Sequence, residues 1–202
     1  VWEGGPMVNL TRIYTRTGDD GTTALGDFSR TSKTDPRLAA YADTNEANAH
    51  LGVAIATGEL DEDVVAVLTR VQNDLFDAGA DLSTPVVEDP KYPPLRIEQS
   101  YIDALESWCD DFGADLPALN SFVLPGGTPF AALLHQARAV TRRAERSAWA
   151  AVDADPEHTS VLPARYLNRL SDLLFILSRV ANRGSGGEGD VTWIPGGDRH
   201  RP

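Results

Sequence analysis

Apolar side chains recur every three or four residues in five separate stretches of the chain, and this period constrains the fold more than any other feature. Residues with this spacing share one face of an α-helix. The second stretch shows the period clearly, with Val64, Val67, Leu68, Val71, Leu75 and Ala78. The connections are short, few segments alternate as a β-strand does, and no segment repeats. We therefore predict an all-α fold, an antiparallel bundle of five helices.

Capping and breaking residues set the expected bounds of these helices. Asp35 is a good N-cap and Pro36 suits the first helical position, so the first helix is expected to run from Pro36 to a stop at Gly58. A proline-rich connector separates the second helix from the third. The remaining helices are expected, in chain order, at about 61–83, 97–113, 128–154 and 160–184.

The five helices are expected to form one domain over residues 7–184, with a loop at 15–35 before the first helix. We leave out the first six residues, VWEGGP, as an upstream extension. The glycine-rich stretch 185–202 has the composition of a C-terminal tail, in which Trp193 and Ile194 are the side chains able to dock.

The acidic balance of the chain limits its partners. The chain has 202 residues and a formal net charge of −12, which argues against nucleic acid as a partner because phosphate-binding proteins usually present a basic surface. The single cysteine, Cys109, excludes a disulfide framework, and no apolar run is long enough for a membrane span. We therefore expect a cytoplasmic protein. Basic residues concentrate around Lys33 and in ARAVTRRAER, which indicates a local anion site.

The stretch TRTGDDGTTALG, residues 15–26, is rich in glycine and threonine. It is not a P-loop or a dinucleotide fingerprint, and it lacks the acidic spacing of an EF-hand. Its backbone N–H groups and hydroxyls are suited to phosphate oxygens. From composition alone, an ordinary surface turn remains the alternative.

Polar residues share one face on each of the last two expected helices. Arg138, Arg142 and Glu145 follow one another at i, i+4 and i+7, which suits a polyphosphate with its magnesium ion. The alternative is a solvated basic face with weak ion pairs. Asn168 and Asp172 likewise share a face, where they either contact a ligand or form hydrogen bonds between helices.

Other common catalytic arrangements find no support in the sequence. Glu46 and His50 are spaced at i+4, whereas di-iron bundles use Glu-x-x-His. There is no Gly-x-Ser-x-Gly motif, and Cys109 has no evident base. Nucleophilic catalysis by a side chain is therefore not expected.

Four motifs, taken together, resemble one known family. YTRTGDDGTTALG, SKTDPRLAAYADTNEANAHLG, FVLPGGTPFAALLHQARAVTRRAER and LNRLSDLLFILSRVAN are similar to the PduO-type ATP:cob(I)alamin adenosyltransferases, in order from about Ile13 to Asn182. The resemblance implies a ferritin-like five-helix bundle that assembles as a homotrimer, with ATP and the corrinoid at the subunit interfaces. It implies transfer of the 5′-deoxyadenosyl group of ATP to cob(I)alamin, which yields adenosylcobalamin and triphosphate.

The resemblance also implies roles for particular residues. Arg138, Arg142, Glu145 and Phe122 are expected to matter most for turnover, with Glu145 near the Mg²⁺ and Phe122 under the corrin ring. The residues expected to bind ATP are Thr15, Arg16, Thr17, Gly18, Thr23, Ala24, Lys33, Arg142, Arg143, Ala144, Glu145, Arg146 and Asn168.

In the implied mechanism cob(I)alamin is itself the nucleophile, so the protein has to orient two reactants and neutralise the leaving triphosphate. A cobalamin reductase and a B12-dependent mutase are the partners that this activity implies. The alternative is a non-catalytic module that binds ATP or adenosylcobalamin and delivers the coenzyme to a mutase.

The sequence departs from the family pattern at two positions. Asp20 stands where relatives often carry lysine, which removes positive charge from the loop. Asn45 stands where the family has an aspartate that pairs with the arginine matching Arg138 across the subunit interface. Asn45 can form a hydrogen bond with that arginine but no ion pair, which makes the role of Arg138 less secure.

Overall fold

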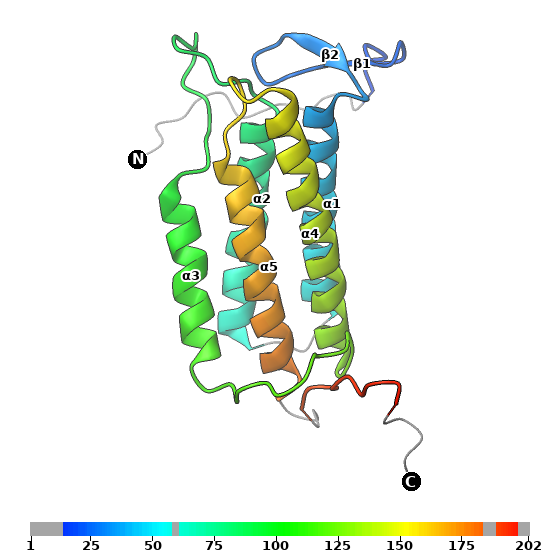
Figure 1. Ribbon diagram of the computed structural model, residues 1–202. Helices are drawn as coiled ribbons and strands as arrows, with labels where there is room; N and C mark the ends of the chain where they lie inside the picture. Colours follow the sequence, from blue (N-terminus) through cyan, green and yellow to red (C-terminus); the bar gives the residue numbers. More distant parts are fainter. Residues whose placement is uncertain (1–13, 58–60, 184–188, 198–202) are drawn as a thin grey trace.

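The computed structural model describes residues 14–57, 61–183 and 189–197, and five long α-helices make up most of this part of the chain (Figure 1). This confirms the predicted all-α class. In chain order the elements are β1 (Thr22–Ala24), β2 (Arg30–Ser32), α1 (Pro36–Thr57), α2 (Glu62–Leu82), α3 (Gln99–Gly113), α4 (Pro129–Ala154) and α5 (Leu162–Ala181). The expected stops at Gly58 and Gly184 and the residues before Met7 lie outside the described residues.

The helices alternate in direction along one common axis (Figure 1). α4 packs against both α1 and α5, α1 packs against α2, and α3 lies against α5. The name loop end is used for the end of the bundle at which α1, α3 and α5 begin, because β1 and β2 lie beside it. The opposite end is called the tail end. None of the helices in the described part of the chain is long and apolar enough to cross a membrane.

Small side chains let α1 and α4 approach closely. Ala40, Ala47 and Ala54 recur every seven residues on α1 and have no exposed surface. Ala137, Ala144 and Ala148 on α4 are equally buried, whereas α5 contributes large residues such as Leu170 and Leu174. Burial of this face holds α4 in place, because an amphipathic helix is stabilised mainly by packing. The polar face of α4 is thereby left toward the surface.

The loop before α1 contains a short hairpin that the sequence did not predict. β1 and β2 pair antiparallel, with Thr22 opposite Ser32 and Ala24 opposite Arg30. Three residues per strand are too few to show an alternating pattern. The predicted N-cap is confirmed, since the N–H of Arg37 donates to Asp35 Oδ1 at 2.9 Å.

Two residues fasten this loop to the bundle. The N–H of Gly26 donates to the carbonyl of Ser83 at 2.8 Å, and a Cβ on Gly26 would lie 1.9 Å from Thr84 Oγ1. Arg37 is buried and donates to the carbonyls of Leu82 and His158 and to the hydroxyl of Thr159, which joins the start of α1 to the end of α2 and to the α4–α5 connection. The loop is therefore held in a fixed position relative to α1 and α2.

The described part of the C-terminal stretch docks at the tail end. The N–H of Trp193 donates to the carbonyl of Phe122 at 2.7 Å, and Val123 forms an antiparallel bridge with Thr192. Arg179 of α5 donates from Nε to Asp190 Oδ2 at 2.8 Å, and both side chains are nearly buried. Although the composition of 185–202 is typical of a tail, its described part packs against the connection before α4.

Candidate active site

The hairpin loop is ordered by hydrogen bonds to Asp20 and Arg30. Asp20 Oδ1 accepts from the N–H of Thr22 at 3.0 Å and from its hydroxyl at 2.7 Å, and these bonds lower the pKa of Asp20. Arg30 donates to the carbonyl of Thr17 at 2.7 Å and to the hydroxyl of Thr22, with Asp20 3.7 Å away. Asp20 therefore builds the turn as well as removing positive charge from it.

Several of the predicted phosphate-binding residues meet in this loop. A Cβ on Gly18 would lie 3.1 Å from Lys33 Nζ, so the lysine ammonium lies beside the glycine backbone. The hydroxyls of Thr15 and Thr17 are 2.9 Å apart and exposed. Arg16 adopts a φ of 63°, a left-handed conformation that turns the chain at this point. Thr23 and Ala24 lie on β1, on the same hairpin.

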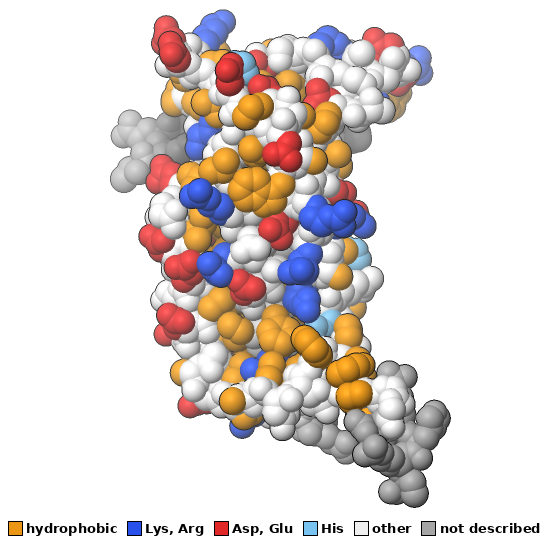
Figure 2. Space-filling view, in the orientation of Figure 1, with side chains coloured by type: hydrophobic (Ala, Val, Ile, Leu, Met, Phe, Trp, Pro, Cys, Tyr) orange, Lys and Arg blue, Asp and Glu red, His pale blue; other side chains and the backbone are white. Residues whose placement is uncertain are grey.

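The polar face of α4 carries cations without partners. Arg142 and Arg146 are exposed and form no hydrogen bond or ion pair within the described residues. Figure 2 shows Lys and Arg side chains gathered over the middle of α4. Glu145 is half-buried and accepts from Asn168 Nδ2 at 3.0 Å, which fixes one of its carboxylate oxygens across to α5. This face is therefore a cationic surface with one positioned carboxylate.

Two of the predicted ATP residues on α4 are engaged within the chain. Arg143 forms ion pairs with Glu46 and, at 3.5 Å, with Asp43 of α1. These carboxylates raise the pKa of Arg143. Ala144 has no exposed surface, so its side chain belongs to the core. Among the predicted α4 residues, Arg142 and Arg146 are thus exposed and unpaired, whereas Arg143 and Ala144 make contacts within the fold.

Arg138 lies further toward the tail end in partly apolar surroundings. Its guanidinium lies 5.3 Å from the centroid of the Phe175 ring, and its Nε is buried without a partner among the described residues. Burial and the neighbouring charge of Arg142 lower the pKa of Arg138. The exposed Asn45 on α1 forms no hydrogen bond with Arg138.

Phe122 stands at the tail end, with 76% of its surface exposed. Its ring packs edge-on against Trp193, with ring centroids 6.0 Å apart. Figure 2 shows hydrophobic side chains gathered at the tail end of this face. The family resemblance singled out Phe122, but nothing in the sequence indicated that Trp193 packs against it, because the two residues are far apart along the chain.

The two groups of predicted residues lie far apart within one chain. The hairpin is held at the loop end, beyond the start of α1 and the end of α4 (Figure 1). Arg142 precedes the end of α4 by about three turns, or roughly 18 Å at 1.5 Å per residue. The loop residues therefore lie close to one another, and the α4 residues lie close to Asn168. Within one chain, however, the loop group and the α4 group do not meet.

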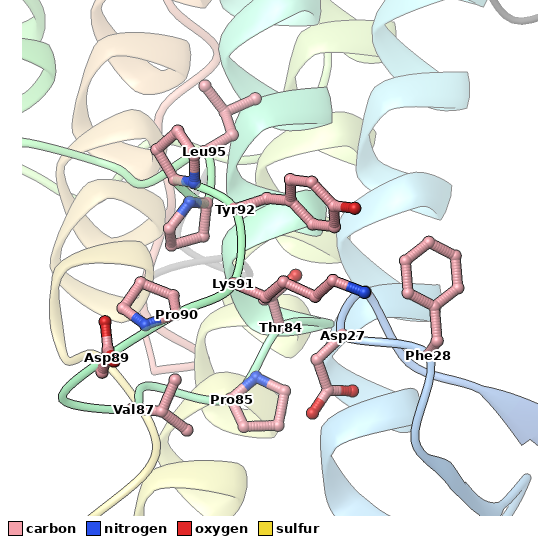
Figure 3. A pocket seen from close by; sticks show the side chains of 13 residues that line it. Asp27, Phe28, Thr84, Pro85, Val87, Asp89, Pro90, Lys91, Tyr92 and Leu95 are labelled. Carbon is pink, nitrogen blue, oxygen red and sulfur yellow. The ribbon is translucent and has the colours of Figure 1, made fainter.

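A separate cavity of about 780 Å³ lies at the loop end (Figure 3). The turn at Asp27 and Phe28 forms one side, and the proline-rich connector with Pro90 and Tyr92 forms the other. It contains none of the residues that the sequence predicted for ATP or the corrinoid.

The fold and the site define a class of protein, an antiparallel helical bundle with a structured Gly/Thr loop at one end and an exposed arginine face on α4. The family model described as cobalamin adenosyltransferase matches residues 13–181. The chain therefore belongs to the cobalamin adenosyltransferase family.

Named relatives agree with this membership. The corrinoid adenosyltransferase of Mycobacterium tuberculosis is 72% identical over 192 residues, which cover 95% of this chain and 97% of that protein. The corrinoid adenosyltransferase of Mycobacterium leprae is 65% identical over 193 residues, 94% of this chain and 99% of that protein.

A solved structure shows the same fold with ligands. It is a phenylalanine-to-alanine variant of the PduO-type ATP:corrinoid adenosyltransferase from Lactobacillus reuteri, complexed with cobalamin and ATP. It is 33% identical to this chain, the match covers 91% of this chain and 100% of that one, and the TM-score is 0.81.

Proposed function

We propose that this protein transfers the 5′-deoxyadenosyl group of ATP to cob(I)alamin, which forms adenosylcobalamin and releases triphosphate. Membership of the family supports this activity, and so do the names of the relatives. The structural observation that carries it is the exposed pair Arg142 and Arg146 beside the positioned carboxylate of Glu145. Unpaired guanidinium groups are suited to a polyphosphate, whose oxygens they bind in planar forks.

The residues divide into a phosphate-binding group and a reaction group. Thr15 to Gly18, Thr23, Ala24 and Lys33 wrap the triphosphate from the loop side. From the helix side, the residues are Arg142, Arg143, Ala144, Glu145, Arg146 and Asn168. Because triphosphate departs with its charge, cations that are already in place stabilise the transition state more than they stabilise bound ATP.

A magnesium ion fits the helix side of this site. One carboxylate oxygen of Glu145 accepts from Asn168 at 3.0 Å, and the other forms no hydrogen bond or ion pair within the described part of the chain. Mg²⁺ in nucleotide sites is bound by one or two carboxylates together with phosphate oxygens and water. Glu145 would hold the ion, which supplies positive charge to the leaving triphosphate.

The corrinoid binds at the tail end, against Phe122. An exposed apolar ring below the corrin excludes water and nitrogen ligands from the lower face of cobalt. Four-coordinate Co(II) is easier to reduce to the Co(I) nucleophile, which then attacks the 5′ carbon of ATP. Arg138, between Phe122 and Arg142 along the molecule, lies where the two substrates have to meet.

The active sites lie between subunits of a homotrimer. The support for this is the separation within one chain, where the loop and Arg142 are roughly 18 Å apart along the axis. A loop from one copy that reaches the α4 face of the next copy closes the site without any distortion of the bundle. We also place the enzyme in the cytoplasm, with a cobalamin reductase and a B12-dependent mutase as partners and residues 7–184 as its catalytic domain.

One anaerobic assay tests the activity. Reduced cobalamin, ATP and Mg²⁺ are mixed with the protein, and the cobalt spectrum and triphosphate release are followed. We expect adenosylcobalamin and triphosphate in equal amounts, and Arg142→Ala should lower turnover at least hundredfold without unfolding the protein. Corrinoid binding without triphosphate release would instead establish a delivery module.

Subunit mixing tests the position of the site. Arg142→Ala lacks the helix side, and the double variant Arg16→Ala/Lys33→Ala lacks the loop side. If each site takes its loop from one copy and its α4 face from another, an equal mixture of the two inactive chains recovers about a quarter of wild-type activity, because random assembly gives one interface in four with both halves intact. No recovery in mixed trimers would place the site within one chain.

A further inference from the structure

The buried polar atoms without partners gather in one place. Among the described residues, the buried side-chain atoms that lack a hydrogen bond are both ring nitrogens of His135, Nε of Arg138 and Oδ1 of Asp190. Buried polar groups are nearly always paired, since an unpaired one loses water and gains nothing in return. Three such residues in one neighbourhood therefore point to a ligand.

Two of the three residues, His135 and Arg138, pack on the ring of Phe175. The His135 ring meets it edge-on with centroids 6.2 Å apart, and Arg138 lies over the same ring at 5.3 Å. The charges of Arg138 and Asp190 both act on His135. Arg179, one turn after Phe175 on α5, holds the other oxygen of Asp190 at 2.8 Å. α4, α5 and the docked C-terminal stretch thus converge on this cluster.

The protonation state of His135 limits what the cluster can bind. Only 4% of the residue is exposed, and burial together with the Arg138 charge lowers the pKa of His135. The imidazole is therefore neutral at neutral pH, with one nitrogen as a donor and the other as an acceptor. Asp190 Oδ1 adds a second acceptor. A primary carboxamide, with two N–H donors and one carbonyl acceptor, matches this set.

The position of the cluster indicates which carboxamide it binds. Asp190 lies three residues before Trp193, which packs on Phe122 at 6.0 Å, so the cluster adjoins the surface to which we assign the corrin ring. The periphery of that ring in cobalamin carries primary carboxamides. ATP carries none.

We propose that His135, with Oδ1 of Asp190, binds a peripheral carboxamide of the corrin ring when residues 191–194 shift to admit the substrate, while Arg179 keeps Asp190 in place. This inference rests on the proposed function and adds to it a residue that recognises the corrinoid and not ATP. Without substrate, the unpaired buried atoms make the docked position of this stretch less stable. The amide of the substrate forms hydrogen bonds with these atoms when it enters.

Three variants test this role. His135→Leu removes the donor and the acceptor, His135→Gln keeps one of each, and His50→Leu makes the same change at a half-buried histidine on α1. Dissociation constants are measured for cob(II)alamin, for cobinamide in the Co(II) state and for ATP, together with the thermal midpoint. Cobinamide retains the ring amides but lacks the nucleotide tail, so it isolates contacts to the ring.

We expect His135→Leu to weaken both corrinoids about five- to tenfold and to leave ATP binding unchanged. Its thermal midpoint should stay the same or rise, because the change removes unpaired buried groups. His135→Gln should bind both corrinoids within about threefold of wild type, and His50→Leu should bind all three ligands as wild type does.

Wild-type affinity of His135→Leu for both corrinoids would overturn the inference. So would a lowered thermal midpoint with equal losses for ATP and corrinoid, which indicates a structural role, or a loss confined to cobalamin, which places the contact at the nucleotide tail. Failure of the wild-type protein to bind any corrinoid would instead refute the proposed function itself, and the inference with it.

Discussion

The side chain of Asn182, just after α5, holds the segment that leads from Phe122 to α4. Removal of this side chain should loosen that segment. The side chain has no exposed surface; its Oδ1 accepts from the N–H of Thr128 at 2.9 Å, and its Nδ2 donates to the carbonyl of Gly126 at 3.2 Å. Gly127 has a φ of 99°, and a Cβ there would lie 2.0 Å from Asn182 Oδ1. The amide is thus enclosed by the backbone just before α4.

Asn182→Ala removes both hydrogen bonds and leaves the half-buried N–H of Thr128 without its acceptor. At about 1 kcal/mol for each bond and a further amount for the unpaired group, we expect a loss of about 2–4 kcal/mol in the free energy of unfolding. In a chain of this size that corresponds to a thermal midpoint lower by about 5–12 °C. Because Phe122 lies in the loosened connection, KM for the corrinoid should rise while KM for ATP stays unchanged.

Urea unfolding, a thermal scan and steady-state kinetics measure these effects. Asn73→Ala is the matched control, since Asn73 is exposed and its amide donates only to the carbonyl of Thr69 within the same helix. That change should alter stability by less than about 0.5 kcal/mol. The reasoning is refuted if Asn182→Ala costs no more than Asn73→Ala, or if KM for ATP rises in place of KM for the corrinoid.

Two further predictions concern the hairpin loop. In Gly26→Ala the new Cβ would lie 1.9 Å from Thr84 Oγ1, so the loop has to shift and calorimetry should show weaker ATP binding with unchanged corrinoid binding. Asp20→Asn keeps the acceptor for Thr22 and removes the charge, so ATP should bind about two- to fivefold tighter at low salt, and the gain should shrink as salt is raised. Asp20→Ala, which also loses the acceptor, should bind ATP less tightly than Asp20→Asn; equal affinity would show that the turn does not matter.

The helices could be predicted because their signals are local. The period of apolar residues on α2 and the Asp35–Pro36 start of α1 are each contained in one helix, and the structure agrees with them to within a few residues. The shared face of Arg138, Arg142 and Glu145 follows from helix geometry alone. Their roles in ATP binding came from the resemblance and stay predictions.

The remaining features depend on contacts between distant parts of the chain. The sequence did not single out Arg37, yet Arg37 is buried and donates to the carbonyls of Leu82 and His158, which lie far from it along the chain. The sequence did not single out His135, and only the structure shows that its ring nitrogens are buried without partners among the described residues. The sequence indicated docking of the tail only through the apolar Trp193 and Ile194 in a glycine-rich stretch, and such a composition does not reveal where a segment packs.

The arginine face of α4 should cost stability until a phosphate neutralises it. Burial and the charge of Arg142 together disfavour the charged form of Arg138, whose pKa they lower, so the two cations oppose each other in the free protein. Arg142→Ala removes this repulsion together with the ATP contact. We expect its thermal midpoint without ATP to equal or exceed that of wild type. With ATP at about a hundred times its dissociation constant, wild type should gain about 2.7 kcal/mol and Arg142→Ala, at the same concentration, far less. A variant that is less stable without ATP would mean that Arg142 supports the fold, and the exposed arginine face would then no longer indicate a site for triphosphate.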